Sequence, residues 1–245
     1  MDRLAGPAVL DADQARASAV RRLFDGAASD YDRVASLMAL GCGTGYRRAA
    51  LVRSGLARGM RVLDIAIGTG LVAREALRIV GPGGGVTGVD ASAGMLARAA
   101  ATLPVGLVQG LGEALPVRAA RFDFVSLGYA LRHLDQPAAF AEMLRVLRPG
   151  GIVCILEVSA PAAAILRQAL GMYIGRVVPL VAGLVGARPV TRELWRYFWH
   201  TVDLAVPPAA VLQNLAATGF GDARRHLVHG IFAEYTARKP AAPEA

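Results

Sequence analysis

The sequence predicts an α/β fold in which a mostly parallel sheet carries helices on both faces and ends in an antiparallel hairpin. Short apolar runs alternate with helix-length amphipathic segments between residues 58 and 159, a rhythm typical of parallel sheets. Two further strand-like runs close to the C-terminus, separated by a short turn, indicate the hairpin. The stretch from residue 61 to residue 90 contains the strongest of these signals.

Residues 61–90 form the first predicted strand–helix–strand unit. The sequence RVLDIAIGTG begins with an apolar run too short for a helix, which favours a strand buried on both faces. Gly68 and Gly70 then allow a sharp turn before the helical segment LVAREALRIV. The next strand, GVTGVD, ends in Asp90, where an acid can accept hydrogen bonds from both hydroxyls of a ribose. The unit therefore predicts a nucleoside ligand.

Asp64 determines which nucleoside we expect. Gly68, Gly70 and Ala73 also satisfy the dinucleotide spacing G-x-G-x-x-G/A. A carboxylate directly before the turn would repel a pyrophosphate, whereas it suits the cationic amino-acid end of S-adenosylmethionine. The sequence thus favours a charged sulfonium nucleoside over NAD. An ordinary βα turn with a solvated aspartate is the alternative that stays open.

The remaining elements follow from the same periodicities. We expect Ser92 to cap the helix that follows the second strand. We expect the helix before the fifth strand to end at Pro149. Gly41–Gly45 resembles a second nucleotide turn, but no strand leads into it, so we expect a loop before a helix that opens at Tyr46. The helical tract from residue 160 to 205 is expected to break at Pro179 and again at GLVGARP. The expected segments are helices 15–23, 34–40, 92–103, 138–151 and 207–220, and strands 104–110, 121–128, 152–159, 223–230 and 231–240.

At 245 residues the chain is long enough for one large core, and we expect a single domain with extensions. Its expected parts are an N-terminal helical lid (1–57), a cofactor-binding core (58–159), an apolar helical insertion (160–206), a C-terminal helix and hairpin (207–239) and a tail (240–245).

Composition narrows the function classes. The net charge is +8, but Lys239 is the only lysine and the arginines are dispersed, so we expect no nucleic-acid partner. Apolar surface and arginine together favour a weak attraction to anionic membranes. Arg167 and Arg176 interrupt the most apolar tract and argue against a spanning helix. The sequence has two cysteines, no metal-ligand cluster and no signal-peptide pattern. We therefore expect a cytoplasmic protein without a bound metal. Any membrane association is expected on the inner face of the membrane.

The accumulated motifs resemble class I S-adenosylmethionine-dependent methyltransferases, and within them the ubiquinone/menaquinone biosynthesis C-methyltransferases. FDGAASDYD is similar to that family's F-x-S-V-A-x-x-Y-D, and VLDIAIGTG to V-L-D-L-A-G-G-T-G. YALRHL resembles F-G-L-R-N-V, LRVLRPGG resembles the family's helix end before the fifth strand, LEVSAP resembles L-E-F-S-K-P, and WRYFWHTV is a looser counterpart of Y-x-Y-L-x-E-S-I. The resemblance runs from about Phe24 to Lys239 and implies a Rossmann-like, seven-stranded sheet.

The resemblance also implies how S-adenosylmethionine is held. The methionine portion would lie against the glycine turn, the ribose on Asp90, and the sulfonium near Gly128. Leu111 departs from the family, where an Asp or Asn usually accepts the adenine amino group's hydrogen bond. The full set of expected cofactor residues is Asp64, Gly68, Thr69, Gly70, Asp90, Ala91, Met95, Leu111, Gly112 and Gly128.

The family's chemistry implies a ring-carbon acceptor that becomes nucleophilic once a neighbouring phenol loses its proton. Arg132 is the expected phenolate stabiliser, and a structural ion pair is its alternative. Tyr31 and Tyr46 are expected to orient a ring hydroxyl or to pack the lid, and His133 or His200 to act as base. The expected substrate is an apolar or prenylated aromatic, and the insertion 160–206 is expected to face lipid, form a homodimer contact or add core. The alternatives are an O- or N-methyltransferase and a non-catalytic lipid- or quinone-binding protein.

Overall fold

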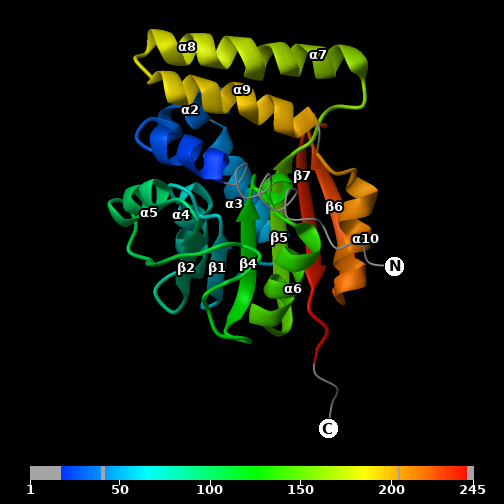
Figure 1. Cartoon of the computed structure of the whole chain (residues 1–245). Helices are drawn as coiled ribbons and strands as arrows, with labels where there is room; N and C mark the ends of the chain where they lie inside the picture. Colours follow the sequence, from blue (N-terminus) through cyan, green and yellow to red (C-terminus); the bar gives the residue numbers. More distant parts are fainter. Residues whose placement is uncertain (1–17, 40–41, 204, 242–245) are drawn as a thin grey trace, which may run out of the picture.

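The computed structural model describes residues 18–39, 42–203 and 205–241. Its sheet has seven strands in the order β3-β2-β1-β4-β5-β7-β6, parallel except for the last two, which run antiparallel (Figure 1). This confirms the predicted fold class, including the C-terminal hairpin. The strands are Arg61–Ile65 (β1), Gly85–Asp90 (β2), Gly106–Gln109 (β3), Phe122–Gly128 (β4), Leu147–Val158 (β5), Gly221–Val228 (β6) and Phe232–Arg238 (β7).

Helices cover both faces of the sheet because its strands are apolar on both sides. Their bounds are Tyr31–Met38 (α2), Gly43–Arg53 (α3), Leu71–Val80 (α4), Ala93–Ala100 (α5), Gln136–Val146 (α6), Ala164–Met172 (α7), Val178–Leu184 (α8), Pro189–Asp203 (α9) and Pro208–Thr218 (α10). Residues 18–27 are also helical. One core lies under α3 and α4, and a second lies under α6 and α10.

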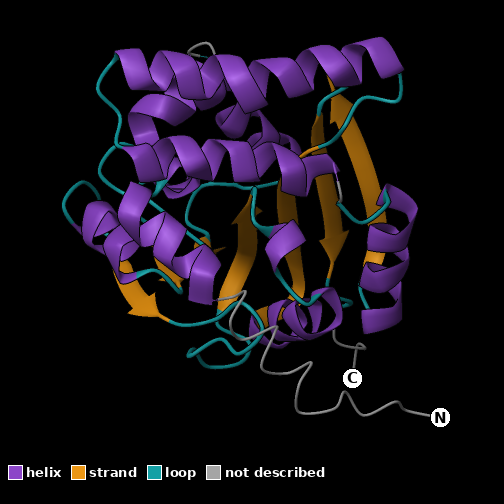
Figure 2. Cartoon of the chain, turned by 45° about the horizontal axis from the view of Figure 1, so that its top comes forward, coloured by secondary structure: helices purple, strands orange, loops and turns teal. Residues whose placement is uncertain are grey.

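A helical layer lies across the carboxyl ends of the parallel strands (Figures 1 and 2). It has its own buried cluster, formed by α2, α8, α9 and the π-helical turn Tyr173–Val177 (η2), which connects α7 to α8. Its members include Val34 of α2, Ile174 of η2, and Trp195 and Phe198 of α9. The layer covers the edge of the sheet at which the nucleoside turn lies.

Local chemistry explains where elements begin. Ser92 caps α5 as predicted, its hydroxyl accepting from the Met95 backbone N–H at 3.0 Å. Gly70, at φ +88°, precedes α4, which starts and ends where the sequence predicted. Asp135 caps α6 in the same way as Ser92 caps α5, through the Ala138 N–H at 2.9 Å.

Several predicted boundaries are wrong, among them the start of α2, which is Tyr31 and not residue 34. Helix α6 ends at Val146, not at Pro149, and residues 147–151 form the irregular start of β5. Its pairing shifts because Phe122 faces Leu147 while Phe124 already faces Ile152, a β-bulge pattern. Helix α3 begins at Gly43, within the expected loop. The N–H groups of a first helical turn need no intrahelical acceptor, so the turn can start at a glycine.

Pro179 does not break the helical insertion. The chain is helical without interruption from Ala164 to Leu184. The wider π turn η2 ends at Val177, so Pro179 lies in the first turn of α8, where its missing N–H and its ring are tolerated. The second expected break, at GLVGARP, is confirmed: the turn at residues 185–188 reverses the chain into α9.

Candidate active site

The β1–α4 connection is held in left-handed backbone conformations. Ala66, Gly68 and Gly70 have φ of +51°, +57° and +88°, which glycine adopts without a steric cost. A Cβ on Gly70 would lie 2.2 Å from the Leu103 side chain, so only glycine fits there. The turn is tied to β2 by the Ile67 N–H, which donates to the Val89 carbonyl at 3.1 Å. The loop is therefore a rigid, narrow cradle.

Asp90 fixes this cradle from the end of β2. One carboxylate oxygen accepts from the Gly68 N–H and the other from the Ser92 N–H, each at 2.8 Å. Burial raises the pKa of the Asp90 carboxyl, while these two backbone donors lower it. Each carboxylate oxygen keeps a further lone pair for a ligand hydroxyl. The geometry thus leaves Asp90 able to bind a diol.

The predicted adenine-side residues lie beyond Asp90. Met95 is buried, Leu111 is 52% exposed, and Gly112 packs near Leu134. Ala91 accepts at its carbonyl from the Gln109 side chain at 3.0 Å. Among these positions, Leu111 offers no side-chain acceptor for an amino group.

The helix over residues 18–27 closes over this region. Asp25 accepts from the Ser92 hydroxyl at 2.6 Å and from the Gly94 N–H at 2.9 Å. On the other side of the turn, the Thr69 hydroxyl donates to Asp32 of α2. The N-terminal helical segment is therefore attached to the start of α5 through Asp25 and to the glycine turn through Asp32.

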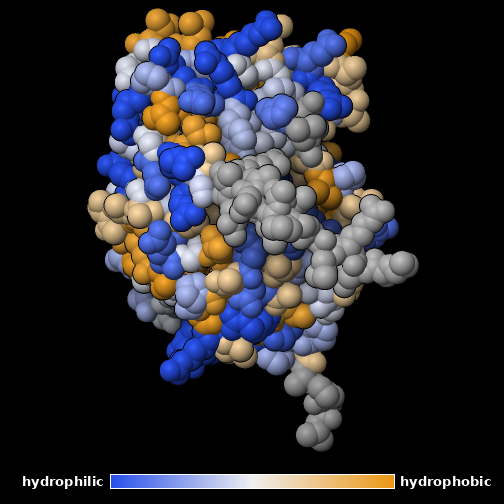
Figure 3. All heavy atoms as spheres, viewed as in Figure 1, coloured by the Kyte–Doolittle hydropathy of each residue, from blue (hydrophilic) through white to orange (hydrophobic). Residues whose placement is uncertain are grey.

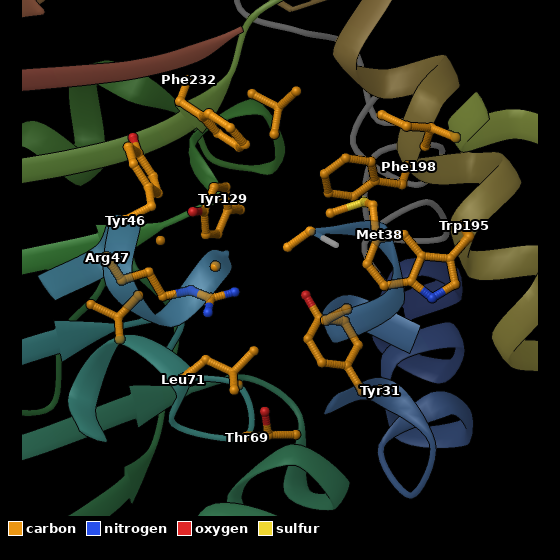
Figure 4. A pocket seen from close by; sticks show the side chains of 18 of the residues that line it. Tyr31, Met38, Tyr46, Arg47, Thr69, Leu71, Tyr129, Trp195, Phe198 and Phe232 are labelled. Atoms are coloured by element: carbon orange, nitrogen blue, oxygen red, sulfur yellow. The ribbon is translucent and has the colours of Figure 1, made fainter. Parts of the chain in front are cut away.

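A cavity of about 350 Å³ lies between the turn and the helical layer (Figure 4). It brings together six of the predicted residues, and the other eight do not line it. Lining it are Tyr31, Tyr46, Asp64, Gly68, Thr69 and Gly128; outside it are Gly70, Asp90, Ala91, Met95, Leu111, Gly112, Arg132 and His133. The cavity thus covers the predicted methionine side of the site.

Two opposite charges line this cavity. Asp64 is 1% exposed, and one of its oxygens accepts from the Ser126 hydroxyl at 2.6 Å. Its Oδ2 is buried without a hydrogen-bond partner among the described residues. Burial raises the pKa of Asp64 to about 7, partly offset by the Ser126 hydrogen bond. The opposite charge is Arg47, the one cationic side chain that lines the cavity in the described chain.

Arg47 is a site residue that the sequence did not reveal. It is 9% exposed, its guanidinium points toward the middle of the cavity, and its Nε has no hydrogen-bond partner among the described residues (Figure 4). The guanidinium carbon lies 5.8 Å from the centre of the Tyr129 ring, within range for a cation–π contact. In the sequence Arg47 is one of two adjacent arginines near a helix start, so only the fold distinguishes it from Arg48.

Aromatic and aliphatic side chains together form most of the rest of the cavity wall. Tyr31 stacks on Trp195 at a centroid distance of 5.7 Å, and Tyr46 packs on Phe232 at 4.6 Å. In Figure 4 the Tyr31 hydroxyl points into the cavity, whereas the Tyr46 hydroxyl points away from its middle. Burial, with smaller contributions from neighbouring tyrosine and glutamate side chains, raises the pKa of the Tyr46 phenol. Burial likewise raises the pKa of Tyr31.

Arg132 lies behind this wall. Its Nη1 donates to both oxygens of Glu157 at 3.0 and 2.9 Å and to the Tyr129 carbonyl at 2.7 Å. Its Nε donates to Thr201 at 3.0 Å, and the Phe198 ring covers its guanidinium at 4.3 Å. This is the geometry of the structural ion pair that the sequence left as an alternative. Burial raises the pKa of Glu157, whereas the Arg132 charge lowers it.

The histidines lie outside the cavity. His133 stacks on Tyr197 of α9 at 5.7 Å and meets the edge of Phe24 at 6.1 Å, which places it where the N-terminal helix meets the helical layer. His200 is exposed on α9. Among the described residues no group of three or more His, Cys, Asp or Glu side chains is arranged to hold a metal ion.

Comparison with known proteins identifies the family. The model of the ubiE/COQ5 methyltransferase family matches residues 11–239. This chain belongs to that family. It is 36% identical over 195 residues to the ubiquinone/menaquinone biosynthesis C-methyltransferase UbiE of Hahella chejuensis, covering 76% of this chain and 77% of that protein. It is 35% identical over 225 residues to the demethylmenaquinone methyltransferase of Roseiflexus castenholzii, covering 90% and 92%.

Solved structures place this ubiE/COQ5-family protein in the methyltransferase fold. A possible histamine N-methyltransferase from Thermotoga maritima superposes with a TM-score of 0.63 at 18% identity, covering 90% of this chain and 99% of that one. Phosphoethanolamine N-methyltransferase 2 of Haemonchus contortus, in complex with S-adenosyl-L-methionine, gives 0.57 at 18% identity over 80% of this chain and 52% of that one. The chain is an S-adenosylmethionine-dependent methyltransferase, which confirms the predicted enzyme class and cofactor.

Proposed function

We propose that this methyltransferase transfers a methyl group from S-adenosylmethionine to a ring carbon of an apolar quinol, as the names of its C-methyltransferase relatives suggest. The observation that carries the proposal is the aromatic-walled cavity that opens directly on the Gly68–Thr69 turn. A flat, apolar ring fits such a wall, and the turn fits the nucleoside. A small number of polar groups in an otherwise apolar cavity is typical of a small-molecule site.

The two charges in the cavity fit the cofactor's zwitterionic end. We propose that Asp64, through its unpartnered oxygen, binds the amino group, and that Arg47 binds the carboxylate. Asp90 would bind the ribose, the turn residues Gly68, Thr69 and Gly70 would follow the chain of the ligand, and Gly128 would lie near its sulfur. Ala91, Met95, Leu111 and Gly112 would flank the adenine. Bound there, the cofactor supplies an electrophilic methyl group on a sulfonium.

The chain's own residues then position the acceptor and exclude water. We propose that the Tyr31 hydroxyl binds an oxygen of the ring, because it points into the cavity and its raised pKa keeps it a neutral donor. Tyr46 orients the ring through the face that it presents beside Phe232. The wall is apolar, so a bound phenolate is poorly hydrated and remains nucleophilic.

Arg132 and His133 act from behind the wall in this proposal. Arg132 holds the Tyr129 carbonyl and the Glu157 carboxylate, and its charge also lowers the pKa of Tyr31. His133 links the N-terminal helix to α9 through its two ring contacts. Both are therefore proposed as positioning residues for the reaction.

We further propose a role for each segment of the chain and a location for the enzyme in the cell. We propose that residues 1–57 act as a lid, that 58–159 bind the cofactor, that the insertion 160–206 receives the apolar tail, that 207–239 complete the sheet, and that 240–245 form a tail. The enzyme would work in the cytoplasm on the inner membrane face, as a monomer or homodimer. A prenylated substrate, itself confined to a bilayer, supports the membrane contact.

Product analysis tests the proposed function. The enzyme is incubated with ¹³C-methyl-labelled cofactor and a chemically reduced demethylated naphthoquinol or benzoquinol, and the product is examined by NMR. We expect a methyl signal on a ring carbon, and no product from the oxidised quinone, which has no phenol to ionise. A methyl ether would replace the proposal with O-methylation. Absence of product together with absence of cofactor binding would favour the accessory-protein alternative.

A further inference from the structure

The outer face of the helix Ala164–Leu184 is apolar and uncovered. None of the α7 residues is buried, and only 17% of the most apolar window of the whole helix is buried. Its mean hydropathy of 1.2 and its 21 residues make it long and apolar enough to cross a bilayer by composition alone. The exposed fractions of its large apolar side chains are 81% for Ile165, 60% for Leu166, 59% for Met172, 41% for Val177, 66% for Leu180 and 79% for Leu184.

The inner face of the same helix has a different chemistry. Leu170, Tyr173 and Ile174 line the active-site cavity. Gly171 lies against Trp199 of α9, so closely that a Cβ there would be 2.8 Å from the indole. The Tyr173 hydroxyl also donates to the Leu37 carbonyl of α2 at 3.1 Å. The helix is therefore held along its inner side as part of the active-site wall, whereas the described residues leave its outer side exposed.

The charge of this region is one-sided. Between Glu157 and Glu193 the chain contains four arginines and no acidic residue, and one of the four, Arg188, is paired with Asp30 of the N-terminal segment. Arg167 and Arg176 lie on exposed positions of the helix itself. Figure 3 shows apolar surface at the α8 end of this edge, next to hydrophilic side chains. Apolar side chains bordered by arginine are complementary to the headgroup layer of an anionic membrane.

We propose that the helix Ala164–Leu184 lies in the plane of an anionic lipid surface, with its outer face among the acyl chains and its inner face on the cavity. A helix lying flat agrees with the contacts of Gly171 and Tyr173, because crossing the bilayer would remove the helix from α9 and open the cavity. An apolar substrate then passes from the bilayer to the cavity along Leu170 and Ile174. This last step depends on the proposed function, whereas the docking itself does not.

Vesicle binding by the full chain tests the docking surface. The probes are vesicles of phosphatidylcholine alone and of phosphatidylcholine with phosphatidylglycerol. We expect binding to the anionic vesicles, a loss of about tenfold or more for Leu166→Glu or Leu180→Glu, and a loss of about fivefold for Arg176→Gln. The arginine effect should fade at high salt. The matched control is Val52→Glu, an equally exposed apolar residue (54%) on α3, which should bind as wild type.

Several results would overturn the proposal. Wild-type protein that ignores anionic vesicles, or Leu166→Glu and Leu180→Glu proteins that bind them normally, would refute a docking role. Resistance of bound protein to carbonate extraction would indicate a spanning helix. A different outcome is a wild type that sediments as a dimer, fails to bind vesicles, and becomes monomeric on the Leu180→Glu change. That combination would show that a second copy of the chain covers this face. Unchanged thermal melting of the variants verifies that folding is intact.

Turnover separates this inference from the proposed function. The Leu180→Glu variant should methylate a short-tailed, water-soluble quinol at the wild-type rate. On a long-tailed quinol held in vesicles, its methylation rate should fall in proportion to its loss of vesicle binding. If wild type binds vesicles yet methylates neither quinol, the proposed function fails while the docking surface stands. If Leu180→Glu loses vesicle binding but keeps its rate on the vesicle-held quinol, delivery through this face is refuted.

Discussion

Protonation of Asp64 should control the affinity for the cofactor. Its carboxyl is 1% exposed and has a pKa raised by burial to about 7, from an ordinary value of 3.8. The proposed role requires the ionised form, which attracts the ligand's amino group. At pH 6, one unit below this pKa, about one carboxyl in ten is ionised, and at pH 7.5 about three in four. The dissociation constant of S-adenosylhomocysteine should therefore be about eightfold larger at pH 6 than at pH 7.5.

Calorimetry measures the same effect as proton release. Binding at pH 6 should release close to one proton, visible as a difference in heat between buffers of different ionisation enthalpy. Asp64→Asn should bind more weakly at pH 8, show a nearly flat pH dependence below pH 7.5, and release almost no proton. The range ends there because the ligand's own amino group titrates above it. A wild-type affinity that does not change between pH 6 and 7.5 would refute the reasoning.

The raised pKa of Asp64 also determines how the stability of the ligand-free protein changes with pH. Between its unfolded value near 4 and its folded value of about 7, Asp64 binds a proton more tightly in the folded protein. Its contribution therefore opposes folding increasingly as pH rises through that window. Asp64→Asn should accordingly flatten the decline of ligand-free stability between pH 4 and 7, measured by urea denaturation. A decline unchanged by the substitution would contradict the assignment.

Three further changes test other parts of the site. Arg47→Gln should weaken S-adenosylhomocysteine by about 10- to 100-fold but leave 5′-methylthioadenosine, which lacks the carboxylate, unaffected in titration; equal losses for both would contradict its role. Arg132→Met should cost about 3–5 kcal/mol in urea denaturation by stranding Glu157, and adding Glu157→Leu should recover most of it; no recovery would refute the ion-pair account. Gly70→Ala should lower the free energy of unfolding, measured by urea denaturation, by about 2–4 kcal/mol. The control Gly59→Ala should lower it by about 1–2 kcal/mol, because Gly59 has a similar φ of +81° but open space around it. Equal losses would refute the steric argument.

Local sequence patterns predicted the nucleotide-binding half of the fold. The strand at residues 61–65 is buried at four of its five positions and is followed by Gly68 and Gly70, and the helix at 71–80 and the strand at 85–90 lie where expected. Each of these signals depends on neighbours within a few residues, so the sequence contains them in full. Asp90 reaches the turn from the end of the adjacent parallel strand, and its bond to Gly68 follows directly from that topology.

The rest depended on contacts between distant segments. The bulge before Ile152 ends α6 early because β4 pairs with residues that the local pattern assigns to a helix. Arg132 was expected to face the substrate, but Glu157 on the neighbouring strand and Phe198 on α9 enclose it. Arg47 entered the site for the opposite reason, since only the packing of α3 against the turn directs one arginine among many into the cavity.

A crystal structure of the complex with S-adenosylhomocysteine tests the central claim most directly. The account predicts the ligand's amino nitrogen at about 3 Å from Asp64, its carboxylate on Arg47, and both ribose hydroxyls on Asp90. A carboxylate bound by a different cation, or a ribose turned away from Asp90, would contradict it.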